Sequence, residues 1–312
     1  MKTFFTSRQF SFSKASQKNF CSSLLMFTLL LGGGFRALAQ TTLMSWDVST
    51  QTGTAATGSL SPSVSNANLA SGSGALTRGA GVIPQGLARA WGGSNWEQTT
   101  LANLSSNKNI TFNVTPKPGF AISLSAINPF SYRRSANGPQ NAIVEATANS
   151  ITSGISQGAI AFGNSTASGA DITPTVNLSA DNFLQNINGP ITFNLSPYGA
   201  TSSDGTLYIF DVANSTASDF SITGRILGSE TLALSGFKNC FGFASTAQSF
   251  PLKGDGLTSD PVVLTAPTGY EISTGGGGYS SSLSITPTSG SINTTISVRL
   301  SASTTAGTYN GV

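Results

Sequence analysis

Residues 110–127 read ITFNVTPKPGFAISLSAI and contain the clearest pattern in the chain. Apolar and polar residues alternate in the first five positions and again in the last eight, which is typical of strands with one buried face. The TPKPG between them predicts a turn, because proline fixes φ and glycine allows positive φ. This stretch therefore predicts two strands joined by a turn.

The same pattern continues on both sides. From Gln40 onward, short alternating or β-branched runs are bounded by Gly, Pro, Asn and Ser, and no helical apolar period is sustained. Residues 49–74 are rich in Ser, Gly, Ala and Asn, which predicts a long surface loop. The fold class is therefore all-β, with an antiparallel, jelly-roll-like β-sandwich over residues 40–227. Its other strands are expected at 42–48, 140–147, 172–178, 190–195, 206–212 and 220–226.

A second set of strands begins near residue 228. About seven short strands in the remaining part of the chain fit a smaller Ig-like β-sandwich over residues 228–312. The last of these strands would leave an unpaired sheet edge, so we expect this domain to be C-terminally truncated. The strands are expected at 231–234, 247–252, 261–265, 270–273, 283–286, 292–300 and 308–312.

The composition of the 312 residues excludes several kinds of chemistry. The chain has no histidine, so it has no Ser-His-Asp triad, no His-ligated zinc and no histidine general base. Charged residues make up only 9% of the chain, about a third of the usual share. The composition therefore favours a strand-rich binding or structural protein over an enzyme.

Residues 1–39 have the features of a secretory signal peptide. They contain five basic residues and no acid, then an apolar run at 24–31, three glycines and the ALA of residues 37–39. This predicts cleavage near Ala39/Gln40 and a secreted or outer-cell-surface location. The apolar run is too short for an anchor that crosses a membrane, and no later segment is long enough, so no membrane span is expected after cleavage.

Removal of the leader changes the charge balance. The remaining chain has 10 Lys+Arg and 12 Asp+Glu, a net charge of −2, so no nucleic acid is expected to bind this region. Cys240 is then the only cysteine, and an intrachain disulfide is excluded. The aromatic residues beside Cys240 predict a buried thiol.

The segment Trp91-Gly92-Gly93-Ser94-Asn95-Trp96-Glu97 has the most distinctive local sequence. Trp91 and Trp96 are candidates to stack on sugar rings, with Asn95 and Glu97 supplying hydrogen bonds. The alternative is that both tryptophans pack in the core, as aromatic side chains commonly do. The possible ligand is a polysaccharide or a cell-surface glycan.

Arg133 and Arg134 follow Tyr132 in an expected strand, so their side chains should point to opposite faces. One of them is expected to form an ion pair with Asp211 or Asp47. The functional alternative is that one arginine binds an anionic sugar or a C-terminal carboxylate through two hydrogen bonds.

The acidic residues show no recognised metal or catalytic motif. A structural calcium ion held by loop carbonyls and one or two aspartates is possible, but no ligands are assigned and no cofactor is predicted. Glycoside hydrolysis needs two carboxylates in one cleft, and no pair is evident in the sequence. The candidates are Asp171, Asp181, Asp204, Asp211 and Asp219.

Two regions resemble modules of secreted multidomain proteins from Bacteroidetes. Residues 233–237, 249–250, 263–273, 279–287 and 298–309 resemble an Ig-like module that is common in these proteins. A less specific resemblance links the first region to a β-sandwich at the start of such proteins. It rests on 46–47, 76–79, 91–96, 130–135, 138–139, 189–193 and 205–209. The resemblance implies a jelly-roll-like fold and a secreted or surface location, without an established activity. Such proteins commonly end in a sorting domain for type IX secretion, which is not in this chain.

These observations predict a non-catalytic part of a larger exported protein. The first domain would mediate adhesion or contact a glycan, and the Ig-like domain would be a spacer. The alternative is an accessory, substrate-targeting region of a secreted hydrolase such as a nuclease, phosphatase or glycosidase. Its catalytic domain would then lie beyond residue 312.

Overall fold

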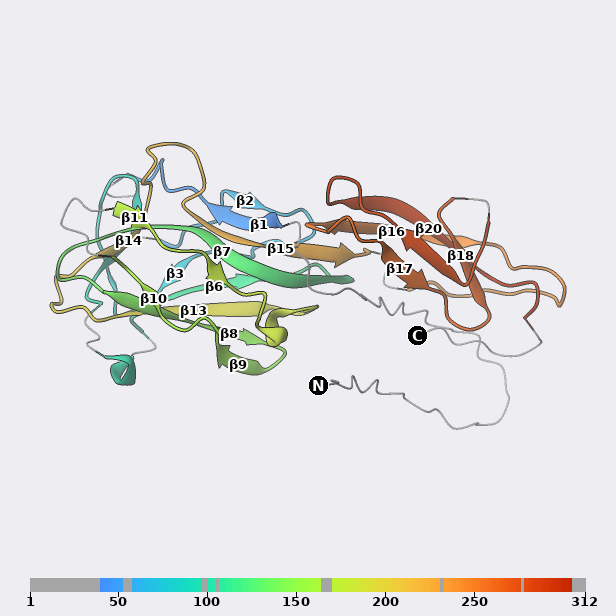
Figure 1. Cartoon of the computed structure of the whole chain (residues 1–312), viewed down its shortest axis with the longest axis horizontal. Coiled ribbons are helices and arrows are strands. Elements are labelled where there is room, and N and C mark those ends of the chain that lie inside the picture. Colours follow the sequence, from blue (N-terminus) through green and yellow to red (C-terminus); the bar gives the residue numbers. More distant parts are fainter. Residues whose placement is uncertain are drawn as a thin grey trace.

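The computed structural model describes residues 40–52, 58–96, 100–104, 107–163, 170–230, 233–275 and 278–304. Nearly all regular structure in these ranges is antiparallel strand, so the all-β prediction is confirmed (Figure 1). Two short 3-10 helices are present, η2 (Leu101–Asn103) and η3 (Asn182–Leu184). Within these ranges, we find no helix with the length and apolar character needed to cross a membrane.

One sheet of the N-terminal sandwich is built around the long strand β7 (Phe120–Arg134). The first part of β7 pairs with β15 (Phe220–Gly228), and its last part pairs with β14 (Leu207–Phe210). β1 (Thr41–Trp46) pairs with β15, and β5 (Ala90–Ser94) pairs with β14. Four two- or three-residue strands extend this β7 sheet: β2 (Val64–Ser65), β4 (Ile83–Pro84), β11 (Ala170–Ile172) and β12 (Val176–Asn177).

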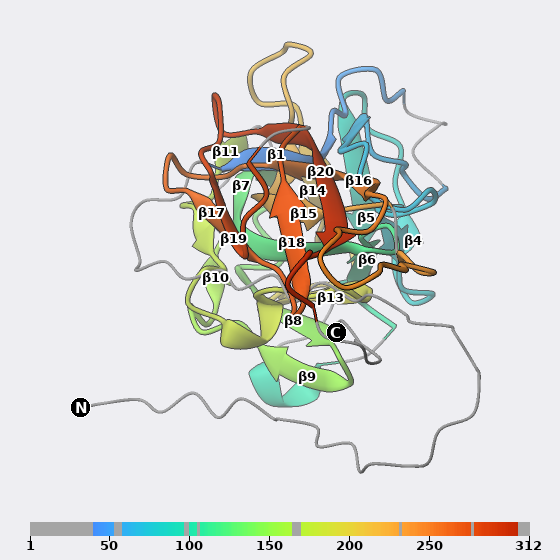
Figure 2. The same ribbon diagram turned by 90° about the vertical axis from the view of Figure 1, so that its right-hand side faces the viewer.

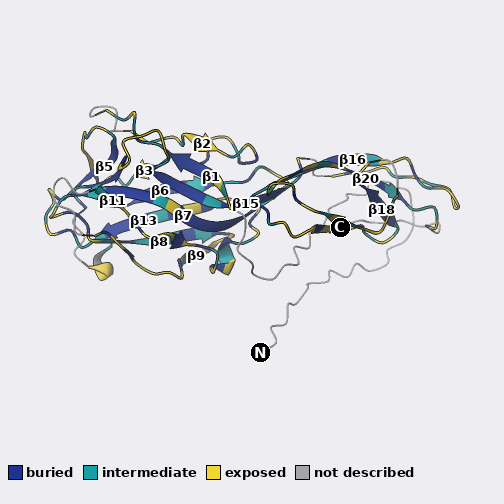
Figure 3. Ribbon diagram, turned by 45° about the horizontal axis from the view of Figure 1, so that its top comes forward, coloured by how far each residue is buried: buried dark blue, intermediate teal, exposed yellow. Residues whose placement is uncertain are grey.

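The facing sheet is built around β13 (Ile191–Tyr198), which pairs with β6 (Ile110–Val114) and β8 (Asn141–Ala148). Figure 3 shows that the buried residues line the space between this β13 sheet and the β7 sheet. The alternation of residues 110–114 in the sequence corresponds to the alternation of buried and half-buried residues in β6. Three further strands extend this sheet: β3 (Thr77–Arg78), β9 (Ile151–Gly154) and β10 (Ile160–Ala161).

Aromatic rings from both sheets meet in the core. Trp46 and Phe220 belong to the β7 sheet, and their ring centroids are 5.3 Å apart. Phe112 of β6 lies 5.6 Å from both of them and stacks on Phe193 of β13 at 4.8 Å. These four buried rings join the two layers of the sandwich, since aromatic side chains contribute the largest apolar area per residue.

The described residues of 49–74 are mostly irregular and exposed or half-buried, as their composition predicted, but this loop also packs on the core. Within the described part, they form β2 and bury Leu69 in the main core. The buried Trp46 indole N–H donates to the Gly74 carbonyl at 3.0 Å and to the Leu60 carbonyl at 3.2 Å. Gly74 has φ +88°, which side chains rarely adopt, and a Cβ there would lie 1.9 Å from Met44 Sδ, so any substitution would be strained and would displace the Met44 side chain.

The C-terminal sandwich is smaller. β16 (Gln248–Asp255), β20 (Ile292–Leu300) and β18 (Tyr270–Ser273) form one layer. The pair β17 (Val262–Thr265) and β19 (Ser282–Ile285) forms the other. Their inner residues form a core separate from that of the first sandwich. The expected strands 270–273 and 292–300 match β18 and β20, whereas Ala233 and Leu234 of the expected strand 231–234 are not in a strand. The expected strand 308–312 lies outside the described residues.

The two sandwiches share strand β15. Ile226 belongs to the first core and Leu227 to the second, so the boundary expected after residue 227 falls inside this strand. Residues 226–228 pair with β7 on one side and with β16 on the other. We call residues 40–226 the N-terminal unit and residues 227–304 the C-terminal unit. Figure 1 shows them end to end, joined by this shared sheet.

Candidate functional site

Trp91 and Trp96 are both in the core. Trp91 is 1% exposed and Trp96 is 0% exposed. The Trp91 indole N–H donates to the Gly58 carbonyl at 3.0 Å, and that of Trp96 donates to the Gly93 carbonyl at 2.7 Å. The Arg78 guanidinium lies 4.0 Å from the centre of the Trp91 ring. These positions fit the packing interpretation, and neither ring is available to stack on a sugar.

Asn95 also has local partners. Its amide nitrogen donates to the Gly81 carbonyl at 2.8 Å, and its side-chain oxygen accepts from Lys108 Nζ at 3.3 Å. Its backbone has φ +65°, which places the residue in a tight turn after β5. Glu97 lies outside the described residues.

Arg134 has a structural role. Its side chain is buried, and its guanidinium donates to the carbonyls of Gly163 at 3.1 Å, Ser135 at 3.1 Å and Gly138 at 3.0 Å. Burial lowers the pKa of Arg134 from its usual value. The guanidinium therefore holds the turn after β7 in place and ties it to the backbone of Gly163.

Arg133 lies on the opposite, outer face of the β7 sheet, as strand geometry predicted. Its guanidinium is 5.5 Å from the centre of the Phe210 ring, and the Arg89 guanidinium is also 5.5 Å from that ring. Phe210, Tyr208 and Ala90 form a small apolar cluster separate from the main core. We call these five residues the outer-face patch.

The strands explain how the outer-face patch forms. Tyr208 and Phe210 alternate in β14 with Leu207 and Ile209, which point into the main core. Tyr208 is paired with Arg133 in the neighbouring strand β7. Burial is the main cause that raises the pKa of Tyr208, and the two nearby cations Arg133 and Arg78 act in the opposite direction. Two cationic groups thus border a largely buried aromatic pair.

The predicted ion pair of Arg133 or Arg134 with Asp211 or Asp47 was wrong. Asp211 instead pairs with Arg89, with 3.5 Å between Asp211 Oδ2 and Arg89 Nη1. Asp47 accepts from the backbone N–H of Ser49 at 2.7 Å. The prediction failed because Arg89 precedes β5, and only the pairing of β5 with β14 brings it beside Asp211.

Asp211 and Asp219 flank an excursion between β14 and β15, the gold loop at the top of Figure 1. The loop begins after β14, which pairs with β7 at Tyr132, and ends at β15, which pairs with β7 at Phe130. Its two ends are therefore close together. Asp219 Oδ2 accepts the backbone N–H of Val48 at 2.9 Å. The pKa of Asp219 is raised to about 6, mainly by burial. The carboxylates of Asp211 and Asp47 act in the same direction, and the Val48 hydrogen bond and Arg89 act against it.

Neither a cluster of metal-ligating side chains nor an open pair of carboxylates is found among these aspartates in the described part of the chain. Asp211 and Asp219 are both buried, so they do not line an open cleft as the paired carboxylates of a glycosidase would. Within the described ranges, no group of three His, Cys, Asp or Glu residues is placed to hold a metal ion. No calcium ligands are therefore assigned from Asp171, Asp181, Asp204, Asp211 and Asp219.

The prediction of a buried Cys240 was wrong, because this residue is exposed. The two phenylalanines beside it are the most exposed large apolar residues described: Phe241 is 75% exposed and Phe243 is 73% exposed. An aromatic-rich run resembles a core segment in sequence. Two features of the sequence could have distinguished an exposed turn from a core segment: the lack of strand alternation and the glycine at position 242. In the structure, Gly242 has φ +88°.

No protein-family model and no curated protein sequence matches this chain. A solved structure described as "Structure of allantoicase" is similar over 85% of this chain and 87% of that chain. The similarity has a TM-score of 0.24 and 10% sequence identity, which is too weak to carry a functional inference.

Proposed function

We propose that this chain is a non-catalytic region of an exported surface protein. The N-terminal unit would contact an acidic glycan, and the C-terminal unit would hold it away from the attachment point. The observation that carries the glycan proposal is the outer-face patch, where Arg89 and Arg133 border the same Phe210 ring. The predicted leader and the resemblance to secreted Bacteroidetes modules support export.

We assign ligand contact to Arg133 because it lies on the outer face of the β7 sheet with its guanidinium beside the Phe210 ring. Arg89 forms an ion pair with Asp211 and donates to the side-chain oxygen of Asn214 at 2.5 Å, and we assign it to positioning the patch. A guanidinium offers two parallel donors to a carboxylate or a sulfate, and sugars that carry these groups are the chemistry that it recognises. The 9% charged composition keeps the rest of the surface weakly charged.

The test is binding of the chain from Gln40 to acidic polysaccharides, polygalacturonate and heparin, with dextran as the neutral comparison. We expect binding to the acidic polymers that weakens as salt increases. Arg133→Ala should weaken it by about tenfold, and Arg133→Lys should restore only part, because ammonium lacks the planar pair of donors. Lys238→Ala is the matched control, an exposed cation in the C-terminal unit.

Equal binding by wild type and Arg133→Ala would reject the assignment of Arg133. Failure of wild type to bind any acidic polymer would reject the glycan proposal. Export has its own test: N-terminal sequencing of secreted protein should begin at Gln40.

A further inference from the structure

Phe241 and Phe243 lie in a turn of the segment between β15 and β16. The Phe243 N–H donates to the Cys240 carbonyl at 3.0 Å, which closes a four-residue turn with Gly242 in its left-handed position. Both side chains project from the surface. Exposure of two large aromatic residues within one turn is unusual, because burial of each would remove a large apolar area from water.

The turn lies at the distal end of the C-terminal unit, away from the N-terminal unit. Gly254 of β16 pairs with Leu227 at the junction, whereas Gln248 of β16 pairs with Val298 at the other end of the sheet. The segment that contains the turn immediately precedes Gln248. Figure 2 looks onto this end of the molecule.

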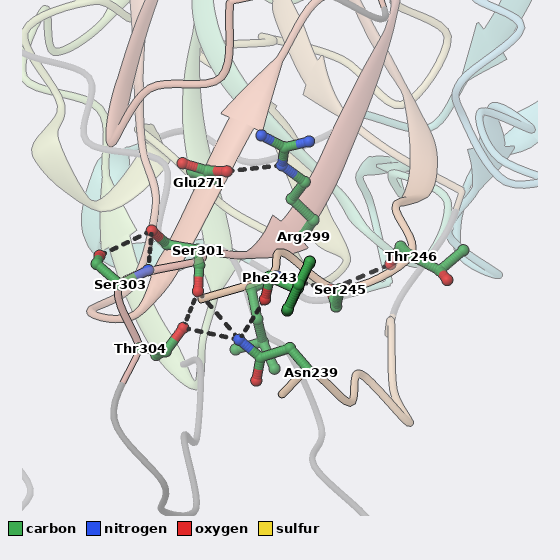
Figure 4. Close-up of polar contacts among 10 residues, drawn as sticks. Asn239, Phe243, Ser245, Thr246, Glu271, Arg299, Ser301, Ser303 and Thr304 are labelled. Carbon is green, nitrogen blue, oxygen red and sulfur yellow. Dashed lines mark hydrogen bonds and ion pairs between the residues drawn. The ribbon is translucent and has the colours of Figure 1, made fainter. Parts of the chain in front are cut away.

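Hydrogen bonds hold the base of the turn firmly. The Asn239 amide nitrogen donates to the carbonyls of Phe243 and Ser301, each at 3.1 Å, and to Thr304 Oγ1 at 3.2 Å (Figure 4). The Gly242 N–H donates to the Ala302 carbonyl at 3.1 Å. The two phenylalanines are therefore presented by a fixed turn, so little conformational entropy opposes their burial by a partner.

Polar groups around the turn are occupied by one another. The Asn239 amide nitrogen is used at the base, and the hydroxyls of Ser301 and Ser303 contact each other at 2.9 Å. A sugar needs hydrogen-bond partners beside its stacking surface. The distal end thus matches an apolar partner better than a glycan.

The charges of the C-terminal unit are unevenly distributed. Lys238 is exposed beside the turn, and Arg299 and Glu271 neutralise each other at 2.6 Å. Asp255 pairs with Ile226 of β15 and Glu230 contacts Lys253 at 3.2 Å, both toward the junction, and the exposed Asp260 lies in the segment between β16 and β17. Lys238 therefore places an exposed positive charge beside the turn, which complements an anionic surface.

We propose that the turn formed by Cys240–Phe243 inserts into the surface of a lipid bilayer with anionic headgroups. Side chains about three-quarters exposed on a convex turn can be fully covered only by a shaped pocket or by a fluid phase. A bilayer covers them without shape complementarity, and Lys238 adds the attraction to anionic headgroups. This inference does not depend on the glycan proposal.

Vesicle sedimentation tests the proposal, with the chain that begins at Gln40, since both cores are formed by residues from Leu43 onward. Wild type should bind vesicles of phosphatidylcholine with 30% phosphatidylglycerol. Phe241→Ser and Phe243→Ser should each weaken the partition by about tenfold, and the double variant by about a hundredfold. Lys238→Ala should weaken it about fivefold. Val263→Ser, an exposed apolar residue of β17, is the control and should have no effect.

Unchanged binding in the double variant would overturn the proposal, as would absence of wild-type binding at every lipid composition. The second result would favour a pocket on a protein partner. Arg133→Ala should leave vesicle binding unchanged, and the double phenylalanine variant should leave glycan binding unchanged. Failure of one proposal can therefore be distinguished from failure of the other.

Discussion

The two ends of the C-terminal unit differ in how far their apolar side chains are buried. At the junction, Leu227 enters its core from the shared strand β15, and the Asn66 amide donates to Asp255 at 3.1 Å. At the distal end, Phe241 and Phe243 remain uncovered. Leu227 at the junction is buried by other residues of the chain, whereas Phe241 and Phe243 at the distal end are exposed to solvent. The difference indicates that the junction is structural and the distal end is available for contact.

The largest expected effect on stability comes from the junction. Leu227→Ala should lower the free energy of unfolding by about 2–4 kcal/mol, because it leaves a cavity where β15 meets the second core. Urea unfolding monitored by far-UV circular dichroism, which reports on the strands of both units, measures this change. A loss below about 1 kcal/mol would show that the junction is loosely packed and would remove the contrast between the two ends.

A backbone change at the same end should have the next largest effect. Gly256 has φ +71°, and a Cβ there would lie 2.3 Å from the Gly224 carbonyl oxygen. Gly256→Ala should therefore destabilise the protein by about 1–3 kcal/mol. Calorimetry should show the C-terminal unit unfolding at a lower temperature. Gly158 has a similar φ of +78°, but a Cβ there would meet no atom within 4 Å. Gly158→Ala therefore measures the cost of the backbone conformation alone, and the additional loss in Gly256→Ala measures the steric clash.

A titration in the N-terminal unit tests whether the shared strand couples the two units. The pKa of Asp219 is about 6 in the folded protein, above the value of about 3.9 in an unfolded chain. The folded state thus binds the proton more tightly, and stability should fall as pH rises through about 6. Asp219→Asn removes the titrating group, so it should flatten this dependence between about pH 4 and pH 6, while its side-chain oxygen can still accept from Val48.

Unfolding midpoints at several pH values measure that dependence. Asp219 directly precedes β15, so the unfolding of the C-terminal unit should follow the same pH trend if the strand transmits stability. An unchanged pH slope in Asp219→Asn would contradict the assignment of the titration to this residue.

The smallest effect on stability is expected at the distal end. The double change Phe241→Ser and Phe243→Ser should alter the free energy of unfolding by less than about 0.5 kcal/mol, because both side chains are already in water. A loss comparable to that of Leu227→Ala would show that these side chains support the fold, and their exposure would then not indicate a contact surface.

Much of the fold was predictable because alternation reports directly on burial in a two-layer sandwich. Ile292–Leu300 and Tyr270–Ser273 were predicted with the bounds that the structure shows. Composition predicted the surface exposure of residues 49–74, but it did not reveal that the Trp46 indole anchors this loop through backbone carbonyls. Contacts made by carbonyl groups leave no trace in residue type.

The candidate site was less predictable. Trp91 and Trp96 have the same residue type whether they pack or stack, so only burial separates the two roles. The two-residue period of a strand correctly predicted that Arg133 and Arg134 point to opposite faces. The contact of Arg133 with Phe210 could not be predicted, because it depends on the pairing of β14 with β7. The exposure of Phe241 runs against the general habit of aromatic residues, which is why the aromatic neighbours of Cys240 led to the prediction of a buried thiol.

The distal end can be observed through Cys240, the only cysteine after residue 39. We would attach an environment-sensitive fluorophore to it and titrate the protein with anionic vesicles, neutral vesicles and acidic polysaccharide. The emission should shift to the blue only with anionic vesicles, and the shift should disappear in the labelled Phe241→Ser and Phe243→Ser double variant. Emission that stays unchanged with anionic vesicles would contradict the assignment of the distal end as a contact surface for lipid.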